Sequence, residues 1–204
     1  MSLQDDYIEY KVVKKSFTST VKQIVNAQKV VEFTKRSKYD GAEKVLLDGF
    51  SEEVVWEVAT QPANQRKKAY TNASIFTKIE VTKKNAPGHS RYRFYWCGEE
   101  FIWKHYGYAG CNFKCVHSIS EEVVADFHYI TWSVLDVGKL KIFPQQHRWS
   151  NGFKEFLIFS VIDIVEDTLA IGRKLNSPAA GKANVNTVGT DSTLETTPFL
   201  VAQN

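Results

Sequence analysis

The residue best suited to carry chemistry in this chain is an aspartate inside an apolar segment. In KEFLIFSVIDIVEDTLAIGRKL, residues 154–175, apolar side chains stand on both sides of Asp163. On a helix, Ser160 lies on the same side as Asp163, and Phe156 and Phe159 flank that side. A buried carboxylate is costly unless it is paired, hydrogen-bonded, protonated or bound to a metal. We therefore predict that Asp163 is buried and anchors an interior polar site.

Two interpretations of Asp163 have different consequences. In the structural one, its carboxylate accepts hydrogen bonds from a neighbouring strand or from a Tyr or Trp side chain. In the functional one, it anchors a ligand, directly or through a divalent metal ion. Alternation in EFIWKHY and CNFKCVH turns Trp103, His105 and His117 toward the interior. Imidazole and carboxylate are ordinary metal ligands, so His105, His117 and Asp163 form a candidate metal site, and the alternative for each histidine is a hydrogen-bonded core residue.

The cysteines do not form a recognisable zinc or catalytic motif. Cys111, Cys115 and His117 on one strand would spread over about 20 Å, too far for a single ion. Cys115 and His117 would lie about 6.6 Å apart on one strand face, out of hydrogen-bond contact for a nucleophile and its base. The chain contains no G-x-S-x-G, P-loop or G-x-G-x-x-G sequence. We therefore do not expect an enzyme.

The segment WCGEEFIWKHYGYAGC, residues 96–111, combines aromatic side chains with three glycines. A hairpin with aromatic cross-strand pairs would explain this composition in structural terms. A platform for a flat ligand, with a glycine-containing lid, would explain it in functional terms. The second interpretation adds Trp103 to the candidate ligand-binding residues.

The elements that must position these residues are mostly short strands. Alternating polarity and turn signals predict ten of them up to residue 145, at 7–13, 30–36, 44–50, 53–60, 74–81, 91–96, 100–106, 113–119, 122–130 and 138–143. The helix 154–171 is apolar on every side and must be enclosed. A closed antiparallel barrel around it provides that enclosure and turns Trp56, Trp103, Phe113 and Phe127 inward.

The chain is expected to form a single domain over residues 1–175, followed by a mostly irregular tail. The tail, 176–204, is rich in Asn, Thr, Gly, Ala and Pro, although PFLVA at 198–202 is apolar enough to dock on the domain. SEEVVWEV begins at Ser51 and SEEVVADF at Ser120, which indicates two related halves or a chance similarity.

With these features the chain resembles the tubby C-terminal-like superfamily, which includes tubby proteins, phospholipid scramblases and plant LURP-one-related proteins. The resemblance rests on the two SEEVV segments, the DVGKLKIF strand and the enclosed helix, over roughly residues 28–172. It implies a twelve-stranded barrel threaded by a hydrophobic helix near the C-terminus. Tubby proteins also carry a basic phosphoinositide site, whose residues do not map onto this chain.

A narrower resemblance, based on length, aromatic content and fold, is to fungal pink chromoproteins, which bind an indolone-type pigment. It implies a soluble, non-enzymatic protein that holds a hydrophobic aromatic small molecule. The expected ligand-binding residues are Asp163, Ser160, Phe156, Phe159, Trp103, His105 and His117. The alternatives are a peripheral membrane or phosphoinositide-binding module and an adaptor domain without a ligand.

Net charge and targeting signals limit the kinds of partner and the cellular location that the sequence predicts. The net charge of +3 is too small to indicate nucleic-acid binding. Basic residues gather early in the chain, either as solvated strand edges and loops or as a surface for anionic lipid headgroups: Lys14, Lys15, Lys35, Arg36, Lys38, Arg66, Lys67, Lys68, Lys83 and Lys84. We see no signal peptide and no transmembrane segment, and we expect a cytoplasmic protein with reduced thiols.

Overall fold

The computed structural model describes residues 7–38, 43–59, 66–86, 89–107, 111–144 and 150–175. Within these ranges the strands are β1 (Ile8–Lys14), β2 (Lys22–Val25), β3 (Val31–Lys38), β4 (Glu43–Asp48), β5 (Val54–Ala59), β6 (Lys67–Asn72), β7 (Thr77–Ala86), β8 (His89–Trp96), β9 (Glu99–Tyr106), β10 (Asn112–His117), β11 (Val123–Tyr129) and β12 (Asp136–Ile142). The helix is α1 (Asn151–Leu175). The chain divides after Leu169 into two compact units, and the barrel belongs to the first.

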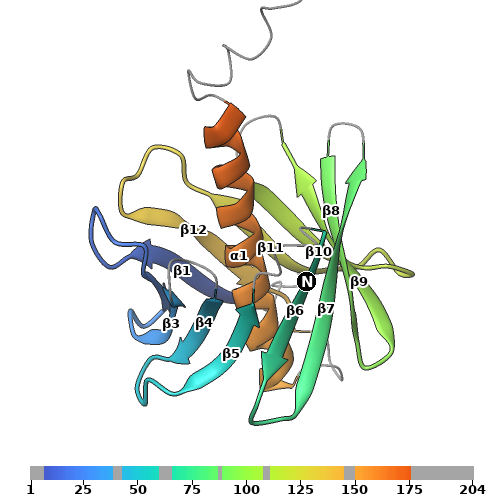
Figure 1. Cartoon of the computed structure of the whole chain (residues 1–204), viewed down its shortest axis with the longest axis horizontal. Helices are drawn as coiled ribbons and strands as arrows, with labels where there is room; N and C mark the ends of the chain where they lie inside the picture. The colour runs from blue at the N-terminus through green and yellow to red at the C-terminus, as the bar shows by residue number, and fades with distance from the viewer. Residues whose placement is uncertain are drawn as a thin grey trace, which may run out of the picture. The chain divides into compact units, whose positions relative to one another are not determined.

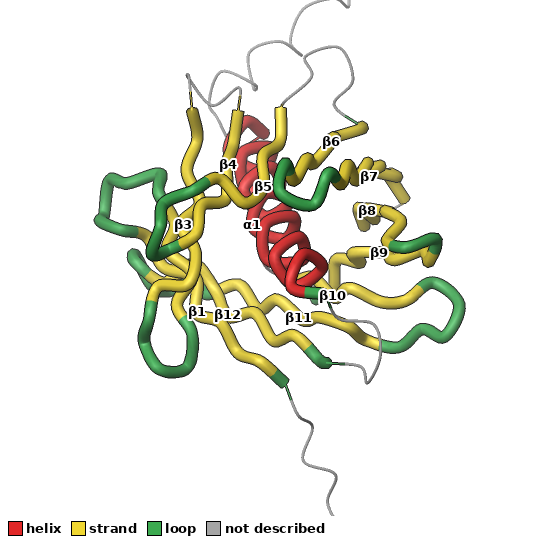
Figure 2. Tube along the Cα trace, turned by 90° about the horizontal axis from the view of Figure 1, so that it is seen from below, coloured by secondary structure: helices red, strands yellow, loops and turns green. Residues whose placement is uncertain are grey.

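The strands form a closed antiparallel barrel. Each strand pairs with the next one in the sequence, and β1 pairs with β12 to close the sheet. Helix α1 runs through the middle of the ring of strands (Figures 1 and 2). The predicted fold class, a twelve-stranded barrel around a hydrophobic helix, is therefore confirmed. Residues 176–204, for which an irregular tail was predicted, lie outside the described residues.

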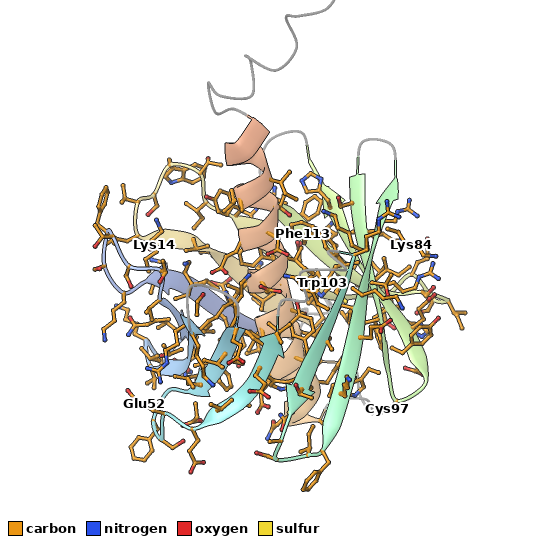
Figure 3. All side chains as sticks on the ribbon, viewed as in Figure 1. Lys14, Glu52, Lys84, Cys97, Trp103 and Phe113 are labelled. Carbon is orange, nitrogen blue, oxygen red and sulfur yellow. The ribbon has the colours of Figure 1, made fainter. Side chains whose placement is uncertain are left out.

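Burial explains why the helix has no polar face over most of its length. From Phe156 to Val165 no residue is more than 2% exposed. Trp103 and Phe113 point from the barrel wall toward the helix (Figure 3), and both are fully buried, as the alternation predicted. Removing this much apolar surface from water stabilises the fold by about 25 cal/mol per Å².

Two strands were missed from the sequence. Strand β2 has only four residues, and β6 has the sequence KKAYTN, in which two lysines precede a single aromatic residue. In β6 the side chains that face the interior are Lys68, Tyr70 and Asn72. A strand whose inward side carries lysine does not show the usual alternation of apolar and polar residues.

The repeated SEEVV sequence reflects a repeated backbone geometry. Leu46 pairs with Trp56 in the β4–β5 hairpin. Cys115 and Ala125 stand 69 positions after Leu46 and Trp56, and they pair with each other in the β10–β11 hairpin. A register shift follows Leu46 in one hairpin and Cys115 in the other. Glu52 and Glu121 have positive φ angles of 57° and 55° in the two turns. This supports two related halves, β1–β6 and β7–β12.

The barrel has two ends: the entry end, where helix α1 begins, and the far end opposite it. The entry end contains the loops β2–β3, β4–β5, β6–β7, β8–β9 and β10–β11, and the described loops of the far end are β1–β2 and β11–β12. Helix α1 begins at the entry end, where the ring of Phe153 lies 5.0 Å from that of Trp96 and 5.1 Å from that of Phe101. Its later turns therefore lie toward the far end.

Candidate functional site

Asp163 is fully buried and has three polar partners from the barrel wall. Its carboxylate forms ion pairs with Lys44 of β4 and Lys68 of β6, the latter at 2.7 Å. Tyr70 of β6 donates its hydroxyl to Asp163 Oδ2, also at 2.7 Å. The prediction that Asp163 is buried is confirmed, and the Tyr70 hydrogen bond is one of those that the structural interpretation offered. The two ammonium groups add an electrostatic component that the sequence did not indicate.

Two further carboxylates continue the same helical face. Glu166 pairs with Lys35 of β3, with Lys22 of β2 at 3.4 Å and with Lys44 at 3.6 Å. Asp167 lies 3.2 Å from the Nζ of Lys44 and 2.5 Å from that of Lys68. Residues three and four positions after Asp163 share its side of the helix, so the three carboxylates project together.

We name this group of residues the lysine–carboxylate cluster: Lys22, Lys35, Lys44, Lys68, Asp163, Glu166 and Asp167. All four lysines come from strands of the first half of the barrel, whereas all three carboxylates come from the helix. The lysine side chains are 2–17% exposed. Ion pairs this deeply buried are only weakly screened by salt. The cluster therefore links four strands to one face of the helix.

Burial and neighbouring charges act in opposite directions on the pKa values of Asp163, Glu166 and Lys35. Burial alone would raise the pKa of Asp163, but the ammonium groups of Lys68, Lys44 and Lys35 hold it well below its usual range. Burial also acts to raise the pKa of Glu166, but the nearby ammonium groups, chiefly that of Lys35, lower it. Burial lowers the pKa of Lys35, because Glu166 offsets only part of the desolvation. Burial and the Asp163 charge raise the pKa of Tyr70 well above its usual value. Asp163 and Glu166 are therefore ionised at neutral pH.

The other predicted helix residues make packing contacts with the wall. Trp103 donates its indole N–H to Ser160 Oγ at 3.2 Å, and Ser160 donates to the carbonyl of Leu157 at 3.3 Å. The rings of Phe156 and Phe159 each lie 5.5 Å from the Tyr70 ring in edge-to-face geometry. The structure thus brings Asp163, Ser160, Phe156, Phe159 and Trp103 into one region, where they contact one another or the barrel wall.

The two histidines do not join this region, and the predicted metal site of His105, His117 and Asp163 is wrong. His117 pairs with Phe101 across the sheet, whereas His105 pairs with Phe113 and lies four positions further along β9, about 13 Å away. His117 Nδ1 is hydrogen-bonded to Ser120 Oγ at 2.9 Å, and the His105 ring lies 5.4 Å from that of Phe113. Among the described residues, no group of three His, Cys, Asp or Glu side chains could hold a metal ion.

Two lysines of the lysine–carboxylate cluster were singled out in the sequence but were interpreted differently. Lys35 and Lys68 belonged to the basic residues assigned to solvated edges or to a lipid surface, and the structure places both inside the barrel. The available signals were the inward position of Phe33, which also turns Lys35 inward, and the spacing of Glu166 and Asp167 from Asp163. For these two lysines, both earlier interpretations are wrong.

A second candidate site is an exposed apolar patch at the far end. It comprises Phe17 in the β1–β2 loop and Trp132, Val134 and Leu135 in the β11–β12 loop, which we name the far-end patch. These side chains are 70%, 81%, 51% and 47% exposed, respectively. The two loops are neighbours because β1 pairs with β12, and the amide of Lys14 donates to the carbonyl of Leu135 at 2.8 Å.

Basic side chains surround the far end, and their position can be followed in Figure 3. Lys14 and Lys84 lie in the upper half of that view, where the later turns of α1 also lie, whereas Glu52 and Cys97 lie at the lower end. The basic residues on strands or loops next to the far end are Lys14, Lys15, Arg36, Lys38, Arg66, Lys67, Lys83, Lys84 and Arg91. The far end therefore combines apolar and cationic groups.

Comparisons with known proteins bear on the fold. No protein-family model matches the chain, and no curated protein matches it. The chain is similar in structure to an Arabidopsis thaliana protein, AT5G01750, whose crystal structure superimposes with a TM-score of 0.54 at 14% sequence identity. The match covers 78% of this chain and 92% of the plant protein. At this identity the likeness shows a common fold. None of the helices in the described part of the chain is long and apolar enough to cross a membrane.

Proposed function

We propose that this chain is a non-enzymatic member of the tubby C-terminal-like superfamily that docks on anionic membrane surfaces through the far end of its barrel. The observation that carries the proposal is the far-end patch. Four large apolar side chains stand in two adjacent loops, and Trp132 alone is 81% exposed. Exposed apolar side chains gathered on neighbouring loops and bordered by polar residues are typical of protein or membrane contact sites. Tryptophan in particular favours the membrane interface.

The charge around the patch favours a membrane over an apolar protein surface. Lys14 and Lys15 are separated from Phe17 by Ser16 alone, and further lysines and arginines follow the rim of the barrel. Each basic side chain near an anionic leaflet contributes about 1 kcal/mol to membrane binding. The combination of inserted apolar side chains and surrounding cations supplies the two components that reversible membrane binding requires.

Vesicle sedimentation tests the proposal. Wild-type protein is expected to bind vesicles of phosphatidylcholine and phosphatidylserine, and to bind pure phosphatidylcholine much less. Phe17→Ser/Trp132→Ser is expected to abolish most of the binding. The matched control is Phe50→Ser/Phe76→Ser, which removes two even more exposed aromatic rings from the entry end and should leave binding unchanged.

Charge reversal completes this test. Lys14→Glu/Lys15→Glu should reduce binding, whereas Lys29→Glu/Lys78→Glu, which makes the same charge change at the entry end, should not. No binding of the wild-type protein at low salt, or equal losses in both charge variants, would overturn the proposal.

A hydrophobic aromatic small molecule, such as a pigment, is the second candidate ligand. The aromatic lining around the first half of α1 favours it, since Trp56, Trp96 and Phe94 all pack around Phe156. It ranks second because Ser160, Phe156 and Phe159 are already packed, so a ligand there must displace them. The absorption spectrum of protein purified from its native source tests this candidate: a visible band that persists through gel filtration supports it, and a spectrum of aromatic residues alone contradicts it.

A further inference from the structure

The entry end is as distinctive as the far end, and its chemistry is opposite. The acidic residues on or beside its hairpin turns are Asp48, Glu52, Glu53, Glu99, Glu100, Glu121 and Glu122. Three large apolar side chains also stand on turns of this end: Phe50 on the β4–β5 turn is 99% exposed, Phe76 on the β6–β7 turn is 96% exposed and Ile119 on the β10–β11 turn is 88% exposed. This end therefore combines exposed apolar side chains with seven carboxylates, which outnumber its lysines, Lys29 and Lys78.

The internal repeat places the same element twice at this end. Phe50-Ser51-Glu52-Glu53 and Ile119-Ser120-Glu121-Glu122 occupy equivalent turns, each with an exposed apolar residue followed by a serine and two glutamates. The amides of Glu52 and Glu121 close the turns by donating to the carbonyls of Asp48 and His117, at 3.1 and 3.0 Å. The two turns are thus closed by the same backbone hydrogen bond, and each carries an exposed apolar residue before its two glutamates.

We propose that the entry end of one chain binds the far end of a second copy, so that copies associate head to tail. The occupant is identified by complementarity of charge and polarity. The far end offers cations around Phe17 and Trp132, whereas the entry end offers carboxylates around Phe50 and Ile119. Opposite charges on facing surfaces direct association and fix its orientation. This inference goes beyond the proposed membrane docking, although it involves the same far end.

The predicted mode of association has a specific signature. When two different surfaces of the same protein bind each other, the pair that they form still has one free surface of each kind to offer. Copies therefore add one after another as an open chain, unless the rotation between neighbouring copies closes the chain into a ring. In sedimentation velocity at low salt, the weight-average mass should rise continuously with protein concentration. It should fall toward that of a single chain at high salt, because the screening length shortens from about 10 Å at 0.1 M to about 3 Å at 1 M.

Matched variants locate the contact. Glu52→Lys/Glu122→Lys reverses two exposed carboxylates of the entry end and should raise the apparent Kd of self-association by about tenfold or more. Glu57→Lys/Glu80→Lys makes the same charge change at exposed positions on the barrel wall, and association should be preserved. Lys15→Glu/Lys84→Glu at the far end should also prevent association.

Mixing the two end variants gives the decisive result. Each is defective alone, but the intact far end of the first can bind the intact entry end of the second, so a mixture should form one-to-one pairs. Vesicle binding separates this inference from the proposed function, since the entry-end variant should still bind anionic vesicles. A mass that stays at one chain at all concentrations, a plateau at exactly two chains for the wild type, or no pairing in the mixture would overturn the head-to-tail contact.

Discussion

Replacing Asp163 by asparagine tests whether the charge of its side chain, and not only its hydrogen bonds, stabilises the helix inside the barrel. The substitution keeps the shape of the side chain and its capacity to accept a hydrogen bond from Tyr70. It removes the carboxylate that faces Lys44 and Lys68, whose side chains are only 13% and 17% exposed. The cluster then holds four ammonium groups and two carboxylates in place of four and three.

The size of the expected effect follows from this change in charge. Removing one partner of a buried ion pair costs about 3–5 kcal/mol, because the remaining charge is left uncompensated. Loss of a neutral hydrogen bond costs about 1 kcal/mol. Asp167 still contacts both lysines, which places the expected loss for Asp163→Asn near the lower figure, at about 3 kcal/mol.

Urea unfolding followed by tryptophan fluorescence measures this loss. The matched control is Asp126→Asn, because Asp126 also accepts a hydrogen bond from a tyrosine hydroxyl, that of Tyr106 at 2.6 Å, but has no ion pair among the described residues. We expect a loss of about 1 kcal/mol for the control. A double-mutant cycle of Asp163→Asn with Lys68→Met should give a coupling energy of about 1–3 kcal/mol. Equal losses in Asp163→Asn and Asp126→Asn, with no coupling to Lys68, would refute the electrostatic reasoning.

Three further predictions concern the barrel and its interior. Gly138→Ala should destabilise the protein by about 1–3 kcal/mol in urea unfolding, because its Cβ would stand 2.4 Å from the Phe127 ring. Ile158→Asp should prevent folding, since it places an unpaired charge at a fully buried position of α1, and circular dichroism should show an unfolded chain. The lowered pKa values of Asp163 and Glu166 give stability that is complete above their unfolded values of about 4. That stability should be lost as the pH falls further, so acid titration of wild type should show a steeper fall than Asp163→Asn.

The enclosure of the helix was predictable because it depends on local composition. An apolar segment without a polar face must be surrounded, and short alternating strands are the only other elements that the chain offers in number. The inward orientation of Trp56, Trp103 and Phe113 followed from the period of two along each strand. Such signals are contained within one element and require no knowledge of its neighbours.

The partners of Asp163 were not predictable in the same way. Lysine is almost always found at the surface, so Lys35 and Lys68 were interpreted as solvated or lipid-facing residues, and Lys44 was not singled out at all. Only the closed barrel places these three lysines opposite the helix carboxylates. The prediction that the histidines join Asp163 was wrong for a related reason. Alternation correctly turned His117 inward, but its position along strand β10 keeps it away from Asp163. Alternation gives the face of a side chain and does not give its depth in the barrel.

The far-end patch also depends on long-range pairing. Phe17 and Trp132 come together only because β1 and β12, the first and last strands, close the barrel side by side. Neither loop carries a motif of its own. The basic residues beside them were noticed in the sequence, but the apolar groups that complete the surface could be recognised only once the two loops were adjacent.

Fluorescence of Trp132 is the most direct test of the central proposal that the far-end patch enters a membrane. Trp56, Trp96 and Trp103 are buried inside the barrel, whereas Trp132 is 81% exposed and should respond to lipid. Trp149 lies outside the described residues and is replaced by Phe in the protein that is measured. Anionic vesicles should shift the emission to shorter wavelength, and lipids brominated near the headgroup should quench it, with both effects lost in Trp132→Phe. An emission spectrum unchanged by vesicles that sediment with the protein, or quenching that persists in Trp132→Phe, would contradict insertion of this patch.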